Sequence, residues 1–179
     1  MRTRDEIEDT VVALLRRHAI STVPVPVDLI ATAEGVAVIE QTFTGDLSGA
    51  LIRSNGMSAI AVNSTHSPNR KRFTVAHELG HHMLAHKGEE DHVDWEFTVI
   101  RRDGRSSEAN NVQEVEANSF AASLLMPKAI LSADLKLEAG PNGEIDLARD
   151  QIAFLARRYQ VSEVAMKFRL INLGFLSPI

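Results

Sequence analysis

The sequence predicts an α+β fold, in which a small antiparallel sheet with a hairpin lies next to a histidine-rich helix and precedes a mostly helical C-terminal part. Three observations support this. Two apolar stretches flank Asn55-Gly56, a dipeptide whose positive φ angles suit a tight hairpin turn. The histidine-rich segment 73–86 follows the hairpin closely. The final segment, 146–176, repeats apolar residues at helical spacing and is broken near Gln160.

The composition is that of an ordinary soluble globular protein. The chain has 179 residues, 44% of them apolar and 24% charged, so it is long enough to bury a core within one domain. Its net charge of -5 argues against a protein built mainly to wrap nucleic acid, for which a basic face is expected. There is no cysteine, which excludes disulfides and thiolate metal sites and leaves His, Asp and Glu as possible ligands.

The N-terminus and the hydropathy pattern favour a cytoplasmic protein. Residues 1–17, MRTRDEIEDTVVALLRR, are too charged for a secretory signal peptide. No apolar run approaches the length needed to span a membrane. We therefore expect no association with a membrane.

Local signals predict two helices and a strand before the hairpin. Thr3 and Glu6 form a capping-box pattern, and apolar residues follow at helical spacing as far as His18. A short second helix is expected from about Asp28 to Gly35, after which VAVIEQTF has the composition of a strand.

After the histidine-rich segment we expect a long polar loop and then three helices. Residues 88–112 are polar and irregular, with one short strand expected at 95–100. Residues 112–127, VQEVEANSFAASLLMP, are rich in alanine and leucine and form a predicted helix that the final proline ends. The loop 139–144, AGPNGE, precedes the last two helices, and Gly174 ends the second of them.

The segment FTVAHELGHHMLAH holds the strongest functional signal. His77, Glu78 and His81 form an HExxH motif, and on a helix positions i and i+4 lie on one face, one turn apart. Both imidazoles can therefore reach one ion, and zinc accepts imidazole nitrogen at about 2.0–2.1 Å. The alternative interpretation is a chance match on an amphipathic helix. Gly80 favours a metal site over a chance match. Glycine costs a helix about 1 kcal/mol relative to alanine, so its presence indicates close packing against another element.

Glu78 is the predicted catalytic base. It lies beside the first ligand, where it can take a proton from water bound to the metal. Zinc lowers the pKa of that water from about 15.7 to about 7, so a nucleophile is available at neutral pH. The carboxyl group would then pass the proton to the leaving amine.

A catalytic zinc site needs a third protein ligand, and the helix at 112–127 offers carboxylates for it. Glu114 and Asn118 lie four residues apart on one face, beside alanines small enough to allow close approach to the metal-binding helix. Glu114 is the predicted ligand, and Asn118 is placed where it can hydrogen-bond a ligand histidine. We expect Glu116 to be an ordinary solvated glutamate and Glu108, on the loop, to be a weaker candidate still.

The other histidines are not expected to bind the ion. His82 lies about 100° from His81 around the helix, and His86 comes five residues after His81, past the expected helix end. We interpret both as surface or C-terminal capping residues. His66 and His92 lie in predicted loops and could border the cleft.

RFTVAHELGHHMLAH, together with EVEANSFAASLLMP, resembles the ImmA/IrrE family of zinc metallopeptidases. The resemblance spans residues 36–127 and continues weakly into the tail, LARRYQVSEVAMKFRLINLGFL. It implies a zincin-like fold with Zn²⁺ as the cofactor. Carried over residue by residue, it implies that the zinc ligands are His77, His81 and Glu114. It also implies that Glu78 is the base and that the family's Asn-or-Asp position beside the ligands falls on Asn118.

The resemblance also implies a substrate class. Members of the family cleave helix-turn-helix transcriptional repressors and so switch on mobile-element or stress-response genes. Many carry an N-terminal helix-turn-helix domain, for which the early metal motif leaves no room here, so the repressor is expected to be a separate protein. We expect one metallopeptidase domain over 1–179, with the sheet and metal-binding core in 1–127 and a helical subregion in 128–179.

Two further features could serve the same reaction. An edge strand such as SAIAVN, residues 58–63, could pair with an extended substrate segment, although it could equally be a simple core strand. A group other than the metal must stabilise the oxyanion, and nothing in the sequence chooses among Tyr159, Arg70, Arg72 and His66.

The alternative function is a catalytically silent interaction protein that keeps zinc for structure and binds a repressor or DNA through its C-terminal helices. The tail has the shape of a helix-turn-helix unit. From Ile145 to Ile179, however, five Lys/Arg stand against three Asp/Glu, which is little charge for neutralising phosphates. Glu78 argues against a silent protein, because a purely structural site needs no base beside its ligand.

Overall fold

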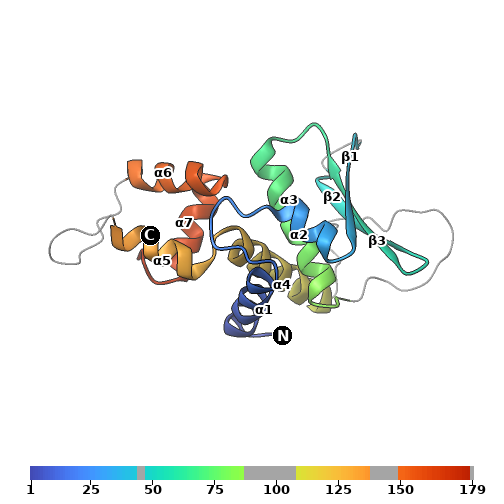
Figure 1. Cartoon of the computed structure of the whole chain (residues 1–179), viewed down its shortest axis with the longest axis horizontal. Coiled ribbons are helices and arrows are strands. Elements are labelled where there is room, and N and C mark those ends of the chain that lie inside the picture. The colour runs from blue at the N-terminus through green and yellow to red at the C-terminus, as the bar shows by residue number, and fades with distance from the viewer. Residues whose placement is uncertain (44–46, 87–107, 138–148, 178–179) are drawn as a thin grey trace.

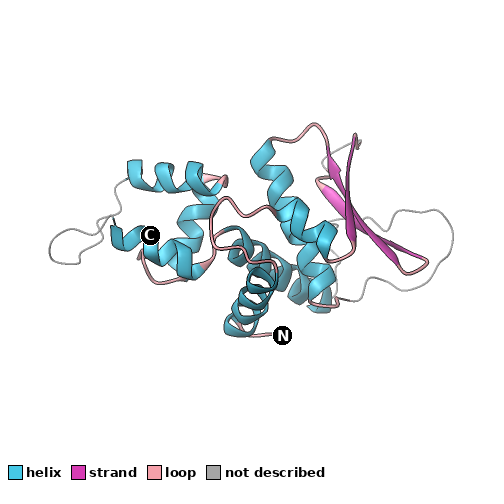
Figure 2. Ribbon diagram, viewed as in Figure 1, coloured by secondary structure: helices cyan, strands magenta, loops and turns pink. Residues whose placement is uncertain are grey.

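The structure is a computed structural model that describes residues 1–43, 47–86, 108–137 and 149–177. Within these ranges the chain forms α1 (Arg4–Arg17), α2 (Val27–Ala33), β1 (Val36–Gln41), β2 (Gly49–Ser54), β3 (Met57–Asn63), α3 (Pro68–Met83), α4 (Glu108–Leu125), α5 (Lys128–Leu137), α6 (Arg149–Tyr159) and α7 (Glu163–Asn172). The sheet lies at one end of the molecule, α5, α6 and α7 lie at the other, and the remaining helices lie between them (Figure 1, Figure 2). The predicted strand at 95–100, the loop at 139–144 and His92 fall outside the described residues. No described helix is long and apolar enough to cross a membrane.

The α+β class is confirmed, but the predicted antiparallel sheet is wrong, because the three described strands form a mixed sheet. Their order is β1-β3-β2, in which β3 pairs antiparallel with β2 and parallel with β1. The chain leaves β1 at one edge, crosses to β2 at the other edge, and returns through β3 in the middle. Residues 58–63 therefore lie in the central strand and not in an edge strand. The hairpin signal specifies only the β2–β3 pair, so it could not reveal the position of β1.

The hairpin turn is confirmed at Asn55-Gly56. Both residues have positive φ angles, 51° and 75°, as a two-residue turn of type I′ requires. Ser54 and Met57 face each other at the ends of the two strands. Because the turn sets the register of β2 on β3, it also sets the position of Leu51, which contacts the site described below.

The capping box of α1 is confirmed. The Glu6 backbone N–H donates to the Thr3 hydroxyl at 3.3 Å, and the Thr3 backbone N–H donates to the Glu6 carboxylate at 2.7 Å. The buried stripe of the helix consists of Ile7, Val11, Leu14 and Leu15. The helix packs on α4, and this contact brings the N-terminus of the chain to the candidate site.

α3 and α4 pack closely because Gly80 has no side chain where α3 meets Phe120 and Ala117 of α4. A Cβ on Gly80 would lie 3.1 Å from Phe120 Cδ1 and 3.3 Å from Ala117 Cα. The glycine lets the two helices approach, as its position within α3 predicts. α4 ends before Pro127 as predicted but begins earlier than predicted, so Glu108 belongs to the helix and not to the preceding loop.

We expect Gly80→Ala to destabilise the protein by up to about 2 kcal/mol. Alanine favours a helix interior by about 1 kcal/mol over glycine, but overpacking a tight contact costs about 1–3 kcal/mol. The added methyl group meets Phe120 and Ala117, so the packing cost should exceed the helix gain. Urea denaturation measures the difference, and Ala153→Gly in α6 gives the helix-propensity contribution in the same protein. A more stable Gly80→Ala protein would contradict the packing described here.

The C-terminal part is helical, as predicted, and contains α5 in addition to the two predicted helices. α6 and α7 are separated at Gln160, which has a φ of 53°. The buried Arg169 of α7 donates from Nε to the Met126 carbonyl at 3.0 Å, and its Nη1 pairs with Glu8 of α1. These contacts attach α7 to the N-terminal helix and to the end of α4.

Candidate metal centre

α3 and α4 bring the three predicted ligands together. His77 and His81 lie one turn apart on α3, and Glu114 approaches them from α4. Their ligand atoms all lie within 4.8 Å of one another. The Nε2 atoms of the two histidines are 3.1 Å apart, and the Glu114 carboxylate oxygens lie 3.4 Å from His77 Nε2 and 3.2 Å from His81 Nε2.

These distances suit a tetrahedral metal ion. Ligand atoms bound at about 2.0–2.2 Å to such an ion lie about 3.3–3.6 Å from one another. Two imidazoles and one carboxylate are a donor set that zinc uses at catalytic sites, where the fourth position stays open. The residues present therefore fit a zinc ion.

The charges of the three side chains also favour a cation. Hydrogen bonds with His77 and His81 hold the pKa of Glu114 well below its usual range, so the carboxyl group is ionised. Burial lowers the pKa of His77, but the hydrogen bond and the charge of Glu114 outweigh burial and raise it. The position between the three side chains thus stabilises positive charge.

Asn118 is hydrogen-bonded to His77. The Nδ1–H of His77 donates to Asn118 Oδ1 over 3.0 Å. This hydrogen bond leaves the lone pair of the neutral imidazole on Nε2, the atom that faces Glu114. The structure therefore places Asn118 one turn beyond Glu114 on α4 and in contact with a predicted ligand.

His86 is buried, so the prediction that it lies at the surface is wrong, whereas its backbone N–H caps the C-terminus of α3. Its Nδ1 lies 3.0 Å from His81 Nδ1, on the side of the His81 ring that faces away from His77 and Glu114. Its Nε2 lies 3.0 Å from the Glu116 carboxylate. Both nitrogens of His86 are therefore engaged, one of them by a predicted ligand.

The backbone after α3 explains the contact between His86 and His81. The helix ends in a Schellman motif, in which the His86 N–H donates to the His81 carbonyl at 3.0 Å and the Ala85 N–H donates to the His82 carbonyl at 3.1 Å. Ala85 takes the left-handed conformation of this motif, with a φ of 50°. The motif turns residue 86 back over residue 81, and a spacing of five residues past the expected helix end does not predict this return. Arg53 of β2 supports the turn by donating to the carbonyls of His81 and His86.

We expect Ala85→Gly to stabilise the fold by about 0.5–1 kcal/mol. A left-handed conformation costs alanine about 1 kcal/mol or more that glycine avoids, and the greater freedom of glycine in the unfolded chain offsets part of this gain. Urea denaturation of the metal-free protein measures the change. The matched control, Ala153→Gly in the interior of α6, should lose about 0.5–1 kcal/mol. Equal losses in both variants would contradict the left-handed turn at residue 85.

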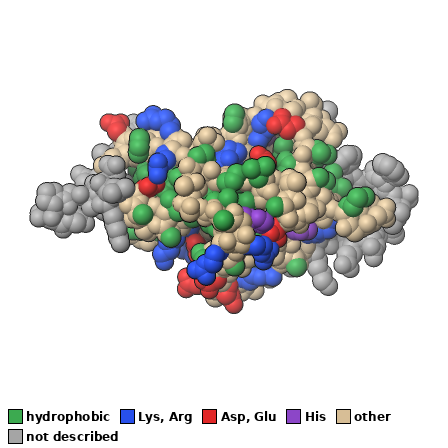
Figure 3. All heavy atoms as spheres, viewed as in Figure 1, with side chains coloured by type: hydrophobic (Ala, Val, Ile, Leu, Met, Phe, Trp, Pro, Cys, Tyr) green, Lys and Arg blue, Asp and Glu red, His purple; other side chains and the backbone are tan. Residues whose placement is uncertain are grey.

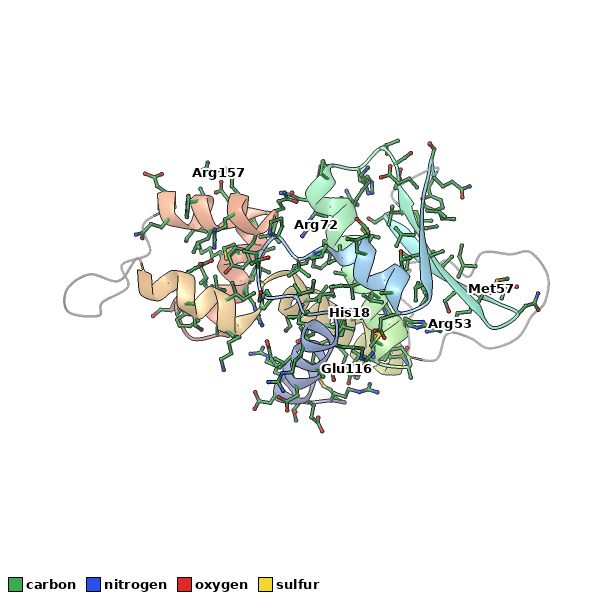
Figure 4. All side chains as sticks on the ribbon, viewed as in Figure 1. His18, Arg53, Met57, Arg72, Glu116 and Arg157 are labelled. Carbon is green, nitrogen blue, oxygen red and sulfur yellow. The ribbon has the colours of Figure 1, made fainter. Side chains whose placement is uncertain are left out.

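Glu116 is buried, so the prediction of a solvated glutamate is wrong. Burial raises its pKa, but hydrogen bonds from Arg2 and His86 outweigh burial and lower the pKa to about 2. Arg2 donates from its backbone N–H and also from Nη1, which lies 2.8 Å from Glu116 Oε2. The face of α4 that carries Glu116 meets the segment before α1 and the end of α3, and not water. Figure 4 labels Glu116 and Arg53, which come to the end of α3 from α4 and β2.

Glu78 lies next to His77 on α3 and is in contact with β2. Its carboxyl group accepts a hydrogen bond from the Leu51 backbone N–H. Burial raises the pKa of Glu78, against the charges of His77 and His81 and against this hydrogen bond. A raised pKa makes a carboxylate a better proton acceptor, as a general base must be.

Three of the oxyanion candidates, Tyr159, Arg70 and Arg72, make hydrogen bonds to groups other than the three ligands. Tyr159 is buried among the C-terminal helices, where it donates to Asp134 Oδ2 at 2.8 Å, and burial raises its pKa. Arg70 and Arg72 donate to Ser48 Oγ and to a backbone carbonyl of the segment before α2.

His82 and His66 do not belong to the ligand cluster. His82 is half-buried, and burial lowers its pKa. His66 has a buried Nδ1 for which the described part of the chain provides no hydrogen-bond partner.

The family follows from a comparison of the whole chain with known families. Residues 31–171 match the Peptidase_M78 model, described as the IrrE N-terminal-like domain. The chain belongs to this family. The matched range includes all five predicted site residues, and it confirms the resemblance to a metallopeptidase family that the two sequence motifs indicate.

Curated relatives of this M78 chain include two proteins named radiation response metalloprotease IrrE. The one from Deinococcus radiodurans is 32% identical over 113 residues, which are 63% of this chain and 30% of that protein. The one from Deinococcus deserti is 33% identical over 111 residues, which are 62% of this chain and 35% of that protein. The matched part of the M78 chain thus spans about a third of the length of these relatives.

A solved structure shares the fold of the M78 chain. A Mycobacterium tuberculosis transcriptional regulator covers 93% of this chain with 46% of its own, at a TM-score of 0.58 and 16% sequence identity. At this identity the likeness shows the fold alone. The arrangement of sheet and helices is therefore found in a longer protein as well.

Proposed function

We propose that this protein is a zinc-dependent endopeptidase with a zincin-like site. The zinc ligands in this proposal are His77, His81 and Glu114. Glu78 is the catalytic base, and Asn118 orients His77. The convergence of the three ligand atoms carries the proposal, because both histidines present Nε2 to the carboxylate. Membership of a peptidase family and the two metalloprotease relatives support it.

Glu78 moves the proton that hydrolysis requires. When bound, zinc supplies a Lewis acid that acidifies water and polarises the scissile carbonyl. Glu78 takes a proton from the attacking water as the water oxygen adds to the carbonyl carbon, and gives it to the leaving amine as the C–N bond breaks. The carboxylate is regenerated, and one peptide bond consumes one water molecule. The hydrogen bond from Leu51 holds the Glu78 carboxyl group beside β2 during these transfers.

We propose β2, in place of β3, as the strand that pairs with the substrate. β3 has a neighbour on each side, whereas β2 pairs only with β3 among the described strands. The Leu51 N–H of β2 donates to Glu78, so the β2 edge of the described sheet lies beside the proposed base. An extended peptide laid along this edge would gain main-chain hydrogen bonds with little demand on its sequence.

The proposed substrate is a helix-turn-helix transcriptional repressor that is encoded separately, and its cleavage would derepress mobile-element or stress-response genes. The resemblance to the ImmA/IrrE family supports this, as does the name radiation response metalloprotease borne by the two relatives. We place the reaction in the cytoplasm and in one metallopeptidase domain over residues 1–179. The contact between Glu8 and Arg169, which ties α1 to α7, supports a single domain.

The charge distribution argues against direct DNA binding by the C-terminal helices. Arg169 is buried against Glu8, and Arg158 pairs with Asp134, so these guanidinium groups are already neutralised within the protein. On the face shown in Figure 3, Lys and Arg side chains are interspersed with Asp and Glu and form no continuous basic stripe over the described residues.

Elemental analysis and a cleavage assay test the proposed function. We expect the purified protein to hold about one zinc ion per chain, as catalytic sites of this type do. It should cut a candidate helix-turn-helix repressor, lose this activity on treatment with a chelator, and regain it when zinc is added. A folded protein that binds no zinc, or cleavage that survives chelation, would overturn the proposal.

A further inference from the structure

The outer nitrogen of His81 is connected to a chain of buried polar groups that reaches the N-terminus. His81 Nδ1 meets His86 Nδ1 at 3.0 Å, and His86 Nε2 meets Glu116 Oε2 at 3.0 Å. Glu116 in turn accepts hydrogen bonds from the backbone N–H and from Nη1 of Arg2. The relative exposures of His81, His86 and Glu116 are 4%, 5% and 3%, so water does not offer them replacement partners.

The direction of each hydrogen bond follows from the carboxylate at the end of the chain. An ionised Glu116 can only accept, so His86 Nε2 carries the hydrogen. Neutral His86 then has its lone pair on Nδ1, and this atom accepts from the Nδ1–H of His81. His81 is left with its lone pair on Nε2, the atom that faces His77 and Glu114. Glu116 thus selects, through His86, the tautomer of His81 that a metal requires.

We propose that His86, Glu116 and Arg2 form a positioning relay, which fixes the tautomer and orientation of His81 and so raises the affinity of the site for zinc. This inference rests on the proposed function, since it takes His81 to be a ligand. None of the three relay residues touches the ion or the substrate. They act through the imidazole of His81.

The relay has a counterpart on the other ligand histidine. Asn118 accepts from His77 Nδ1–H directly, because an amide oxygen is an acceptor in every state. The His86 imidazole can accept at Nδ1 only if its Nε2 holds the hydrogen. It therefore needs the Glu116 carboxylate as the acceptor for that hydrogen. Arg2 fixes that carboxylate and also donates from Nη2 to the Leu84 carbonyl at 2.7 Å, which anchors the end of α3 to the same guanidinium group.

Zinc affinity, measured by competition with a chromophoric chelator, tests the relay. We expect His86→Leu, which removes the acceptor beside His81, to bind zinc about 10–100-fold more weakly than the wild type, as is typical when the outer partner of a metal ligand is lost. His86→Asn offers an amide oxygen to His81 Nδ1 and should recover most of this loss. Arg2→Gln should have a smaller effect than His86→Leu, because the backbone N–H of residue 2 still reaches Glu116. His82→Leu, the same change at a histidine of α3 outside the ligand cluster, is the matched control and should bind zinc as the wild type does.

Two further measurements separate a positioning role from a structural one. In the Co²⁺-loaded protein, the visible absorption reports the geometry of the ligands, and it should change in His86→Leu but not in His82→Leu. Urea denaturation of the metal-free variants measures the stability of the fold independently. If both His86 variants lost stability equally and kept wild-type zinc affinity, His86 would be structural only and the relay would be overturned.

The failure of the relay can be told apart from the failure of the proposed function. A wild-type protein that binds no zinc would overturn both. A wild-type protein that binds zinc through Glu114, together with a His86→Leu protein that binds it equally tightly, would overturn the relay alone.

Discussion

The Glu78→Gln protein is expected to bind zinc as the wild type does and to cleave its protein substrate about 10²–10⁴-fold more slowly. This is the range that general acid–base catalysis contributes. The amide has nearly the size of the carboxyl group but cannot accept a proton from water. Its oxygen can still accept the hydrogen bond from the Leu51 N–H, so the side chain should keep its position. Single-turnover cleavage and elemental analysis measure the two effects on one preparation.

Glu163→Gln is the matched control for this experiment. It makes the same chemical change at an exposed glutamate in the first turn of α7, and it should alter neither the zinc content nor the cleavage rate. Near wild-type cleavage by Glu78→Gln would mean that another group accepts the proton. Loss of zinc from Glu78→Gln would contradict the assignment of Glu78 as a base outside the ligand set.

Local spacing is enough to predict which side chains meet at the site. His77 and His81 are one helical turn apart, so a helix through this segment places both imidazoles on one face. Gly80 and the alanines of α4 indicate that two helices approach closely, and this approach puts Glu114 within 3.4 Å of both histidines. These relations depend on a few neighbouring residues and on one helix–helix contact, and for that reason they can be read from the sequence.

Contacts that depend on the path of the whole chain could not be predicted in this way. Glu116 is bonded to Arg2, 114 positions away in the sequence, so its burial depends on how the N-terminal segment meets α4. His86 lies past the end of α3, where the left-handed conformation of Ala85 replaces helical spacing. The position of β1 beside β3 depends on how the chain passes from β1 to β2, and no pattern within the strands predicts it.

Removing the charge of Glu114 should weaken zinc binding more than any change outside the ligand set. The outer partners of metal ligands are worth about 10–100-fold in affinity, so the loss of a direct ligand in Glu114→Gln should exceed about 100-fold. The amide keeps an oxygen at the same place on α4. The loss of zinc affinity therefore reports the charge of the ligand more than its shape. Competition with a chromophoric chelator measures the affinity.

Asn118→Ala supplies the comparison that decides the ligand set. It removes the acceptor of His77 Nδ1–H but leaves the three ligands in place, and it should cost about 10–100-fold in zinc affinity. If Glu114→Gln bound zinc as tightly as Asn118→Ala, the carboxylate would not be a ligand. Comparing the zinc affinities of the two variants is more informative than either loss alone. Both side chains lie on α4, so a general loosening of α4 against α3 would lower the zinc affinity of both variants to a similar extent.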